Sequence, residues 1–330
     1  MREGVSASVV ACPVGAWPLA LDFLSERLPR VARGEWLARL QRGDVLDDQG
    51  RVLSADAPFR ANTRLYYFRQ LDAEPAIPFE AQIVYQDDTL LVADKPHFLP
   101  VTPGGRYVQQ TLLTRLKRAT GIATLTPIHR IDRETAGLVL FSIRPADRNA
   151  YQSLFRERAV EKVYEAIAPF RQDLTLPLTR RSRMQERADA FMQMEEVAGG
   201  EPNAETLVTL MERLGESARY ELRPRTGQKH QLRVHMSALG VPIYGDRIYP
   251  VLQPEEAAPD FSRPLQLLAR EIAFVDPLTG ERRRFVSGLA LGYCLQMLGG
   301  SAVASASWST HRAAKEQSGG VFCAGKEGRP

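Results

Sequence analysis

The hydrophobic positions near the N-terminus follow a helical period. Between residues 19 and 40, apolar side chains recur every three or four positions, and Pro29 interrupts the pattern. Because proline stops a helix, this spacing predicts two short helices. Their apolar positions are Leu21, Leu24, Leu28, Trp36, Leu37 and Leu40. Short apolar runs then predict small strands at 43–46, 52–53 and 65–68, whereas residues 1–16 show no period and are expected to form a loose arm.

From residue 81 onward, short apolar runs with strand propensity alternate with helical stretches. The expected strands are 83–85, 90–93, 137–141, 162–168, 207–210, 220–222, 267–274 and 284–286. The expected helices are 111–119, 145–158 and 228–238, and a basic cluster at 180–183 is expected on a loop. Many short strands interspersed with helices indicate an α+β domain.

A linker and a polar tail divide the chain. The stretch before residue 80 contains Pro75 and Pro78, which suits a connection between domains, and the residues from 299 onward are small, polar and aperiodic. A chain of 330 residues also exceeds one usual hydrophobic core. We therefore expect an arm at 1–16, a small module at 17–72, a linker at 73–80, a large domain at 81–298 and a disordered tail at 299–330.

Composition excludes several classes of protein. No run of about eighteen apolar residues appears and the N-terminus lacks a secretory layout, so we expect a cytoplasmic protein that does not enter a membrane. The three cysteines are far apart, and neither they nor the five histidines have metal-ligand spacing. No metal site and no disulfide framework are therefore predicted, and we expect a monomer.

The basic residues are almost all arginine, because only six of the 43 Lys and Arg residues are lysine. Arginine binds phosphate in a planar, bidentate manner and stacks on bases, which suits an RNA-binding protein. A GC-rich genome would produce the same bias. The net charge of +4 does not decide between the two explanations.

One acidic residue stands out by its surroundings. Asp132 lies between Arg130 and Arg133, just before an expected strand that begins at Gly137. Nearby guanidinium groups favour the ionised carboxylate, which suits a nucleophile or a base better than a proton donor. A lone acid between two arginines is more often part of an ordinary surface ion pair. This stretch therefore indicates a functional site only together with a second stretch of the chain.

The second stretch lies about a hundred residues later. Thr226 and Gly227 form a turn before an expected helix, where free backbone N–H groups can bind an anion. Lys229, His230 and Arg233 follow within the first turns. From there the Arg233 side chain could reach back to Asp132.

These stretches resemble the motifs of the RNA pseudouridine synthases of the RluA type. The segment from His129 to Leu140 is similar to that family's H-R-L-D-R-x-T-S-G-L-L-L signature, with Ile131 and Ala136 as the differences. Residues 225–235 resemble its R-T-G-R-T-H-Q-I-R-V-H segment, and 162–164 match its K-x-Y. The order and spacing of the three motifs agree, over about residues 80 to 290.

The resemblance implies a reaction that needs no cofactor. Uracil is cleaved from its ribose at N-1, turned, and rejoined through carbon 5. Asp132 would act on the sugar as nucleophile or as base, with Arg233 as its ion-pair partner. Tyr164 would stack on the base and is the candidate for the late proton transfer. The base must first be extruded from the folded RNA, and Arg130 would fill the vacated space.

The other motif residues are expected to contact RNA or the extruded base, and no metal is implied. They are His129, Lys162, Thr226, Gly227, Lys229 and His230. The implied fold is α+β, with a mixed, mostly antiparallel sheet, flanking helices and a central cleft. The two helices and small strands before it, with arginines on the helices, resemble the small S-four-like RNA-binding module.

Ribosomal RNA is the favoured substrate, transfer RNA is the alternative, and the sequence does not specify the uridine. Two other functions remain open. A hydrolase of N-glycosidic bonds would share the aspartate but would usually need a second carboxylate, which the motifs lack. A non-catalytic RNA-binding or ribosome-assembly protein would not need Asp132, Tyr164 and Arg233 together.

Overall fold

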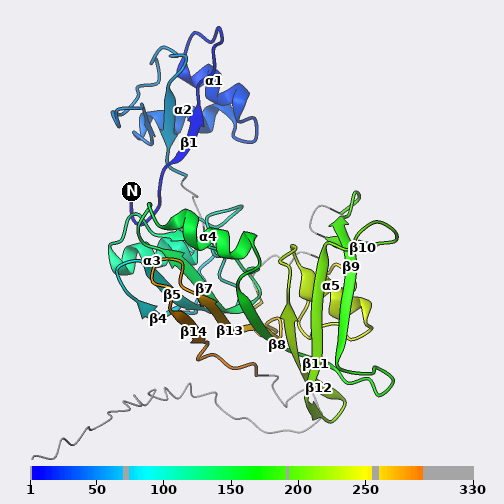
Figure 1. Ribbon diagram of the computed structural model, residues 1–330. Coiled ribbons are helices and arrows are strands. Elements are labelled where there is room, and N and C mark those ends of the chain that lie inside the picture. The colour runs from blue at the N-terminus through cyan, green and yellow to red at the C-terminus, as the bar shows by residue number, and fades with distance from the viewer. Residues whose placement is uncertain (1, 70–73, 191–192, 255–259, 293–330) are drawn as a thin grey trace, which may run out of the picture. The chain divides into compact units, whose positions relative to one another are not determined.

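The computed structural model describes residues 2–69, 74–190, 193–254 and 260–292 (Figure 1). By its internal contacts the chain divides into residues 1–293 and 294–330. The tail predicted at 299–330 lies outside the described residues. So do the last residues, 293–298, of the large domain predicted at 81–298. Within the described residues, no helix is long and apolar enough to cross a membrane.

The N-terminal part contains two helices and a three-stranded antiparallel sheet. The helices are α1 (Ala20–Arg27) and α2 (Arg33–Gln41), as the period predicted. The strands, in their order across the sheet, are β1 (Ser8–Ala11), β3 (Arg64–Tyr67) and β2 (Val45–Leu46). Phe23 and Trp36 are fully buried between the helices and this sheet.

The expected loose arm is wrong at Ser8–Ala11. These residues pair with β3 along their whole length, from Ser8 opposite Tyr67 to Ala11 opposite Arg64. Their side chains alternate between half-buried and exposed, and Cys12 beyond them is buried in the core. A strand of four residues is too short to produce a period that can be recognised, so its partner strand determines it.

The rest of the described chain contains an eleven-stranded sheet and helices that pack on it. The strand order is β10-β9-β11-β12-β8-β13-β7-β5-β4, with β14 paired to β13 and β6 paired to β7. The bounds are β4 (Gln82–Gln86), β5 (Leu90–Lys95), β6 (Thr126–Pro127), β7 (Ala136–Ser142), β8 (Glu161–Pro169), β9 (Leu178–Glu186), β10 (Met194–Val197), β11 (Ala204–Leu214), β12 (Ser217–Pro224), β13 (Leu267–Val275) and β14 (Arg282–Val286). Every named strand pair is antiparallel except β13 with β7. The predicted α+β class with a large, mostly antiparallel sheet is confirmed.

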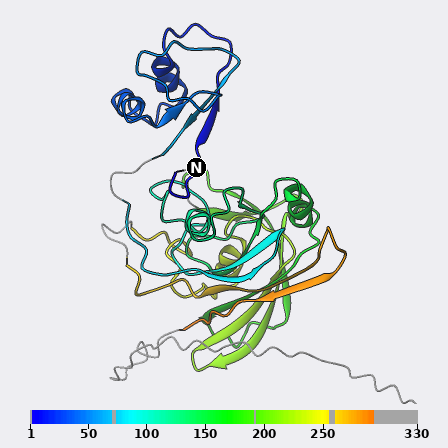
Figure 2. The ribbon, with the colours of Figure 1, turned by 90° about the vertical axis from the view of Figure 1, so that its left-hand side faces the viewer.

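Helices α3 (Leu112–Thr120) and α4 (Arg148–Arg156) pack on opposite faces of β5 and β7. Val139 and Phe141 face α3, whereas Leu138 and Leu140 face Tyr151 of α4. All seven residues of β7 are buried, because the strand is covered on both sides. Burial on two sides explains the continuous apolar run of this strand. β14 lies near β4 (orange and cyan in Figure 2), and the rings of Tyr85 of β4 and Phe285 of β14 pack together at 5.2 Å.

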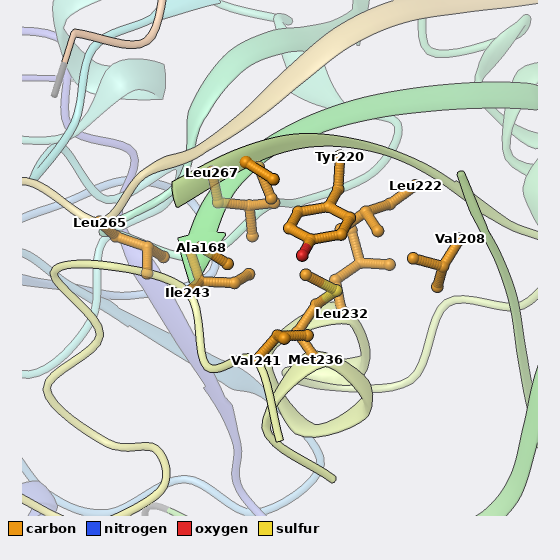
Figure 3. Close-up of a cluster of buried hydrophobic side chains, with 12 residues drawn as sticks. Ala168, Val208, Tyr220, Leu222, Leu232, Met236, Val241, Ile243, Leu265 and Leu267 are labelled. Atoms are coloured by element: carbon orange, nitrogen blue, oxygen red, sulfur yellow. The ribbon is translucent and has the colours of Figure 1, made fainter. Parts of the chain in front are cut away.

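Helix α5 (Gln231–Ala238) covers the other half of the sheet. Its Leu232 and Met236 pack on buried side chains of β8, β11 and β12, among which Tyr220 is the largest (Figure 3). The two halves of the sheet meet where β13 runs parallel to β7. Gly137 makes that meeting possible: its φ is +112°, and a Cβ atom there would lie 2.3 Å from the Ala269 carbonyl oxygen.

The structure corrects four other predicted boundaries. Residues 180–183 lie within β9 and not on a loop, and Val52 forms only an isolated bridge with Leu46. α4 begins at Arg148 and not at Pro145. α5 begins at Gln231 and not at Gln228, because His230 has a left-handed φ of 57° and precedes the helix.

Candidate active site

Asp132 lies on the loop between β6 and β7, and a buried lysine holds that loop. Lys95 is fully buried at the end of β5, and its Nζ donates 3.0 Å hydrogen bonds to the carbonyl oxygens of Pro96 and Arg133. Burial lowers the pKa of Lys95 to about 7. His97 donates from Nδ1 to the Glu134 carbonyl oxygen at 2.7 Å. The backbone on the C-terminal side of Asp132 is therefore attached by two side chains to the end of β5 and to the segment that follows it.

Arg233 of α5 joins two carboxylates. Its guanidinium donates two parallel hydrogen bonds to Asp246, from Nε at 2.8 Å and from Nη2 at 2.7 Å, and a third from Nη1 to Asp132 Oδ2 at 3.2 Å. Asp246 is buried and also accepts the backbone N–H groups of Ile248 and Tyr249. Although burial disfavours the charge, Asp246 and Asp132 raise the pKa of Arg233 above its ordinary value. Arg233 is thus a permanent cation in a fixed orientation behind Asp132.

Tyr164 and Lys162 point from β8 toward the same space. Burial and the negative charge of Asp132 raise the pKa of Tyr164, so its phenol keeps its proton at neutral pH. Lys162 Nζ donates to the Thr226 carbonyl oxygen at 2.9 Å, and burial and the charge of Arg158 lower the pKa of Lys162 to about 8. This hydrogen bond connects β8 to the turn that precedes α5.

That turn is held by one buried amide. The Gln231 side chain accepts from the Thr226 hydroxyl at 2.7 Å and from the Gln228 N–H at 3.0 Å. It donates to the Glu205 carbonyl oxygen and to the Thr206 hydroxyl, both at 2.9 Å. The geometry of residues 226–228 is therefore set by β11, to which Glu205 and Thr206 belong, as well as by α5.

A cavity of about 750 Å³ opens in front of these groups. A smaller one of about 110 Å³ adjoins it, and Asp132, Tyr164 and His230 line both. The cationic residues around the larger cavity are Arg130, Arg133, Arg156, Arg158, Lys162, Arg225 and Lys229. Asp132 is the single carboxylate among the described residues that line either cavity. A concave, cationic site with one acid at its base fits an anionic ligand whose reacting atoms approach Asp132.

All ten predicted site residues line one of the two cavities, and two of them also have partners outside the cavity that hold their side chains. His129 accepts the Leu140 N–H on Nε2 at 3.1 Å and stacks on Phe155 at 4.5 Å, and burial lowers its pKa to about 3. Its ring is therefore neutral and supports the loop. Lys229 forms an exposed ion pair with Glu186 at 3.1 Å.

Arg133 was expected to place positive charge beside Asp132, but its side chain is directed toward other partners. Its guanidinium pairs with Glu134 at 2.6 Å and donates to the Tyr107 hydroxyl at 3.1 Å. Arg130 is exposed and lines the cavity. The ionic partner of Asp132 is supplied by the distant Arg233, because the loop directs the neighbouring Arg133 side chain away.

The chain is similar in sequence to known RNA-modifying enzymes. A family model described as RNA pseudouridylate synthase matches residues 89–238. An uncharacterized RNA pseudouridine synthase of Synechocystis is 31% identical over 233 residues, which are 69% of this chain and 78% of the relative. The dual-specificity RNA pseudouridine synthase RluA of Haemophilus influenzae is 32% identical over 224 residues, covering 65% of this chain and 96% of that protein.

The chain belongs to the RluA-type RNA pseudouridine synthases. A solved structure, human RNA pseudouridylate synthase domain containing 1, covers 68% of this synthase and 96% of its own chain, with a TM-score of 0.52 and 22% identity. That similarity shows the shared fold. Membership of the family confirms the prediction of an isomerase acting on RNA and disfavours the non-catalytic alternative.

Sequence reasoning did not single out Asp246, Gln231 and Tyr249 of this synthase. Asp246 follows Gly245, whose φ is +75° and whose Cβ would lie 2.3 Å from the Pro264 carbonyl oxygen. A glycine beside an acid shortly after a motif helix was the available signal. Gln231 stood inside a motif without a stated role. Tyr249 had no signal, because its contacts come from β10 and from the turn before α5.

Proposed function

We propose that this synthase isomerises specific uridines in structured RNA, with ribosomal RNA as the favoured substrate and transfer RNA as the alternative. The observation that carries the proposal is that Arg233 holds Asp132, the one carboxylate among the described residues that line a cationic cavity of about 750 Å³. Relatives bear names from both substrate classes. The ribosomal large subunit pseudouridine synthase C of Vibrio cholerae is 29% identical, and the mitochondrial tRNA pseudouridine(32) synthase of Saccharomyces cerevisiae is 32% identical.

In the proposed mechanism, an extruded uridine enters the cavity and places its anomeric carbon beside Asp132. Asp132 acts on the sugar as nucleophile or as base, with Arg233 stabilising the carboxylate throughout. Tyr164 stacks on the uracil, and because its phenol is protonated it can take the proton from carbon 5 only as it passes its own hydrogen to the carboxylate of Asp132, whose charge lies nearby. Arg130, which is exposed at the rim of the cavity, fills the space that the base leaves in the RNA.

The cavity supports this reaction over hydrolysis of an N-glycosidic bond. Glycoside hydrolysis usually uses two carboxylates on opposite sides of the bond that breaks. Among the described residues that line the cavity, Asp132 is the single one. The other carboxylate bound to Arg233 is that of Asp246, whose side chain is 1% exposed and accepts from Arg233 on both oxygens.

We also propose that the N-terminal part, from residue 17 to 72, is an S-four-like RNA-binding module joined by a linker at 73–80 to a catalytic domain at 81–298. Its two helices and the turn between them present exposed arginines, which are Arg27 and Arg33 on the helices and Arg30 in the turn. Such a surface suits contacts with phosphate, which supply affinity without sequence preference. A cytoplasmic location and a monomeric state remain predictions.

The rim of the cavity is expected to hold RNA phosphates. Arg158, in the turn between α4 and β8, is exposed, lines the cavity and has a left-handed φ of 58°. Replacing Arg158 by Ala should weaken RNA binding and reduce the slope of log affinity against log salt by about 1, because one phosphate contact is lost. The rate of the chemical step at saturating RNA should change little. Fluorescence anisotropy at several salt concentrations measures the slope.

Arg144→Ala is the matched control for Arg158→Ala. Arg144 is about half exposed, pairs with Asp88 at 3.3 Å and does not line this cavity. Its removal should leave the salt slope as in the wild type. Equal slopes for wild type and Arg158→Ala would remove Arg158 from the RNA interface.

The target is found by deletion of the gene in the source cell, followed by mapping of pseudouridine across total RNA. Complementation with the wild type should restore a lost modification, and complementation with Asp132→Ala should not. A modification that the wild-type gene and the Asp132→Ala gene both restore would contradict the assignment of Asp132 as the catalytic residue. If the map of the deletion strain equals that of its parent, the proposal of ribosomal or transfer RNA as substrate under those conditions is wrong.

A further inference from the structure

Tyr249 lies behind His230, on the side away from the cavity. It belongs to the chain between α5 and β13 and is 7% exposed. Its hydroxyl oxygen is 2.7 Å from the Met194 nitrogen, which donates to it, and 3.0 Å from His230 Nδ1. Its ring meets the His230 ring edge to face at 5.7 Å and also lies 5.4 Å from the Arg233 guanidinium carbon. Tyr249 thus contacts both residues that face Asp132 from this side.

The direction of the hydrogen bond between Tyr249 and His230 follows from the other partner. A backbone N–H can only donate, so the Met194 nitrogen uses the hydroxyl as acceptor. Burial raises the pKa of Tyr249 to about 12, so the hydroxyl keeps its hydrogen at neutral pH. Within the described residues, His230 Nδ1 is the acceptor placed to receive that hydrogen. Nδ1 is then unprotonated, and the ring hydrogen of a neutral His230 must lie on Nε2.

The Nε2 atom faces the proposed catalytic carboxylate. It lies 3.9 Å from Asp132 Oδ2, the oxygen that already accepts from Arg233 Nη1 at 3.2 Å. Burial lowers the pKa of His230, against the opposing attraction of Asp132, so the ring is neutral under the conditions of the reaction. A neutral N–H stabilises negative charge and does not give up its proton, as an imidazolium would.

We propose that Tyr249 is a positioning residue that holds His230 in its Nε2–H tautomer, so that a second hydrogen-bond donor beside Arg233 is directed at Oδ2 of Asp132. Two donors on Oδ2 leave Oδ1 as the oxygen that meets the sugar. His230 Nε2 and Asp132 Oδ2 are 3.9 Å apart, so they reach hydrogen-bond length after a movement of about 1 Å. This inference rests on the proposed role of Asp132 and adds to it the orientation of the carboxylate.

The tautomer can be measured without RNA. Nitrogen-15 spectra of histidine-labelled protein, with His230 assigned from a His230→Gln sample, report which ring nitrogen bears hydrogen. We expect a neutral His230 with hydrogen on Nε2 in the wild type, and a mixture of tautomers in Tyr249→Phe. A wild-type spectrum with hydrogen on Nδ1, or with both nitrogens protonated at neutral pH, would overturn the proposal.

The kinetic test compares two losses of a buried tyrosine hydroxyl. Tyr249→Phe should lower the single-turnover rate on the mapped target RNA about tenfold, the effect of one hydrogen bond in the site, without changing RNA affinity. Tyr220→Phe is the matched control. The Tyr220 hydroxyl is also buried and donates to the Pro169 carbonyl oxygen at 2.7 Å, but it lies in the core beneath α5. Its loss should lower the melting temperature and leave the single-turnover rate unchanged.

Replacement of His230 separates positioning from simple support. In His230→Gln the side-chain amide can place an N–H near the position of Nε2, whereas in His230→Asn the amide corresponds to Nδ1. Gln should therefore retain more activity than Asn. In the His230→Gln background, Tyr249→Phe should cause no further loss in rate, because no tautomer remains to be selected. A tenfold loss in both backgrounds would make Tyr249 merely structural and would overturn the proposal.

The proposed function and the positioning role of Tyr249 can be rejected separately. If wild-type protein forms no pseudouridine in any RNA, the proposed function is wrong, while the tautomer of His230 can still be measured. If Asp132→Asn is inactive as expected but Tyr249→Phe is as fast as the wild type, the function stands and the positioning role of Tyr249 is rejected.

Discussion

Asp132→Asn is expected to lower the single-turnover rate of pseudouridine formation by about 10³-fold or more, which is the scale of loss when the central residue of a catalytic unit is removed. The asparagine amide has nearly the same shape as the carboxylate. It still offers an oxygen to Arg233, which donates to Asp132 at 3.2 Å in the wild type. It is neither a base nor a comparable nucleophile. Conversion of labelled target RNA with enzyme in excess, followed by nucleoside analysis, measures the rate.

RNA affinity should be almost unchanged in Asp132→Asn, because phosphate contacts to the surrounding arginines dominate binding. Removing a negative charge from a cationic cavity cannot weaken the attraction for RNA. Asp173→Asn is the control, since Asp173 is an exposed acid paired with Arg171 away from the cavity. Normal conversion by Asp132→Asn would disprove the assignment of the site.

Asp246→Asn is expected to have the second largest effect, on both stability and rate. Asp246 accepts Arg233 on both oxygens and is 1% exposed, so the substitution leaves a buried guanidinium with Asp132 as its remaining anionic partner. Breaking a buried ion pair of this kind costs about 3–5 kcal/mol. The rate should also fall about 100-fold, because a small displacement of Arg233 misplaces Asp132. Urea denaturation and single-turnover kinetics on folded protein separate the two effects.

Asp276→Asn provides a comparison with the same local chemistry outside the site. Asp276 is fully buried, pairs with Arg283 at 2.6 Å and accepts the Tyr151 hydroxyl at 3.0 Å. We expect a similar loss of stability and an unchanged rate per folded molecule. If Asp276→Asn slowed the reaction as much as Asp246→Asn, the effect of Asp246 would be general destabilisation and not the positioning of Arg233.

The sequence predicted the parts of this site that lie inside contiguous motifs. Asp132, Tyr164 and Arg233 could be named because each stands at a fixed place within a recognisable segment. The contact between Arg233 and Asp132 was also anticipated, over a separation of 101 residues. Elements with long apolar runs, such as β7, could be predicted because a strand that is buried on both sides has a continuous run of apolar residues.

The parts that could not be predicted depend on contacts between distant segments. Arg133 follows Asp132 in the sequence, yet the loop directs its side chain toward Glu134 and Tyr107. The basic residues 180–183 were expected on a loop between strands. In β9 they alternate instead between two environments, with Arg180 paired to Glu196 and Arg181 to Glu205. Such cross-strand partners leave no trace in the local sequence.

The parallel pairing of β13 with β7 determines when this enzyme can be completed during synthesis. β13 lies between β7 and β8, although it is made roughly a hundred residues after β8. Until residues 267–275 leave the ribosome, the edge of β8 and the start of β7 at Ala136 and Gly137 lack the strand that pairs with them, and exposed edges favour association with other chains. Asp132 and Arg233 are both synthesised before that moment. The nascent protein therefore contains its proposed catalytic residues before it has the strand that joins the two halves of the sheet around them.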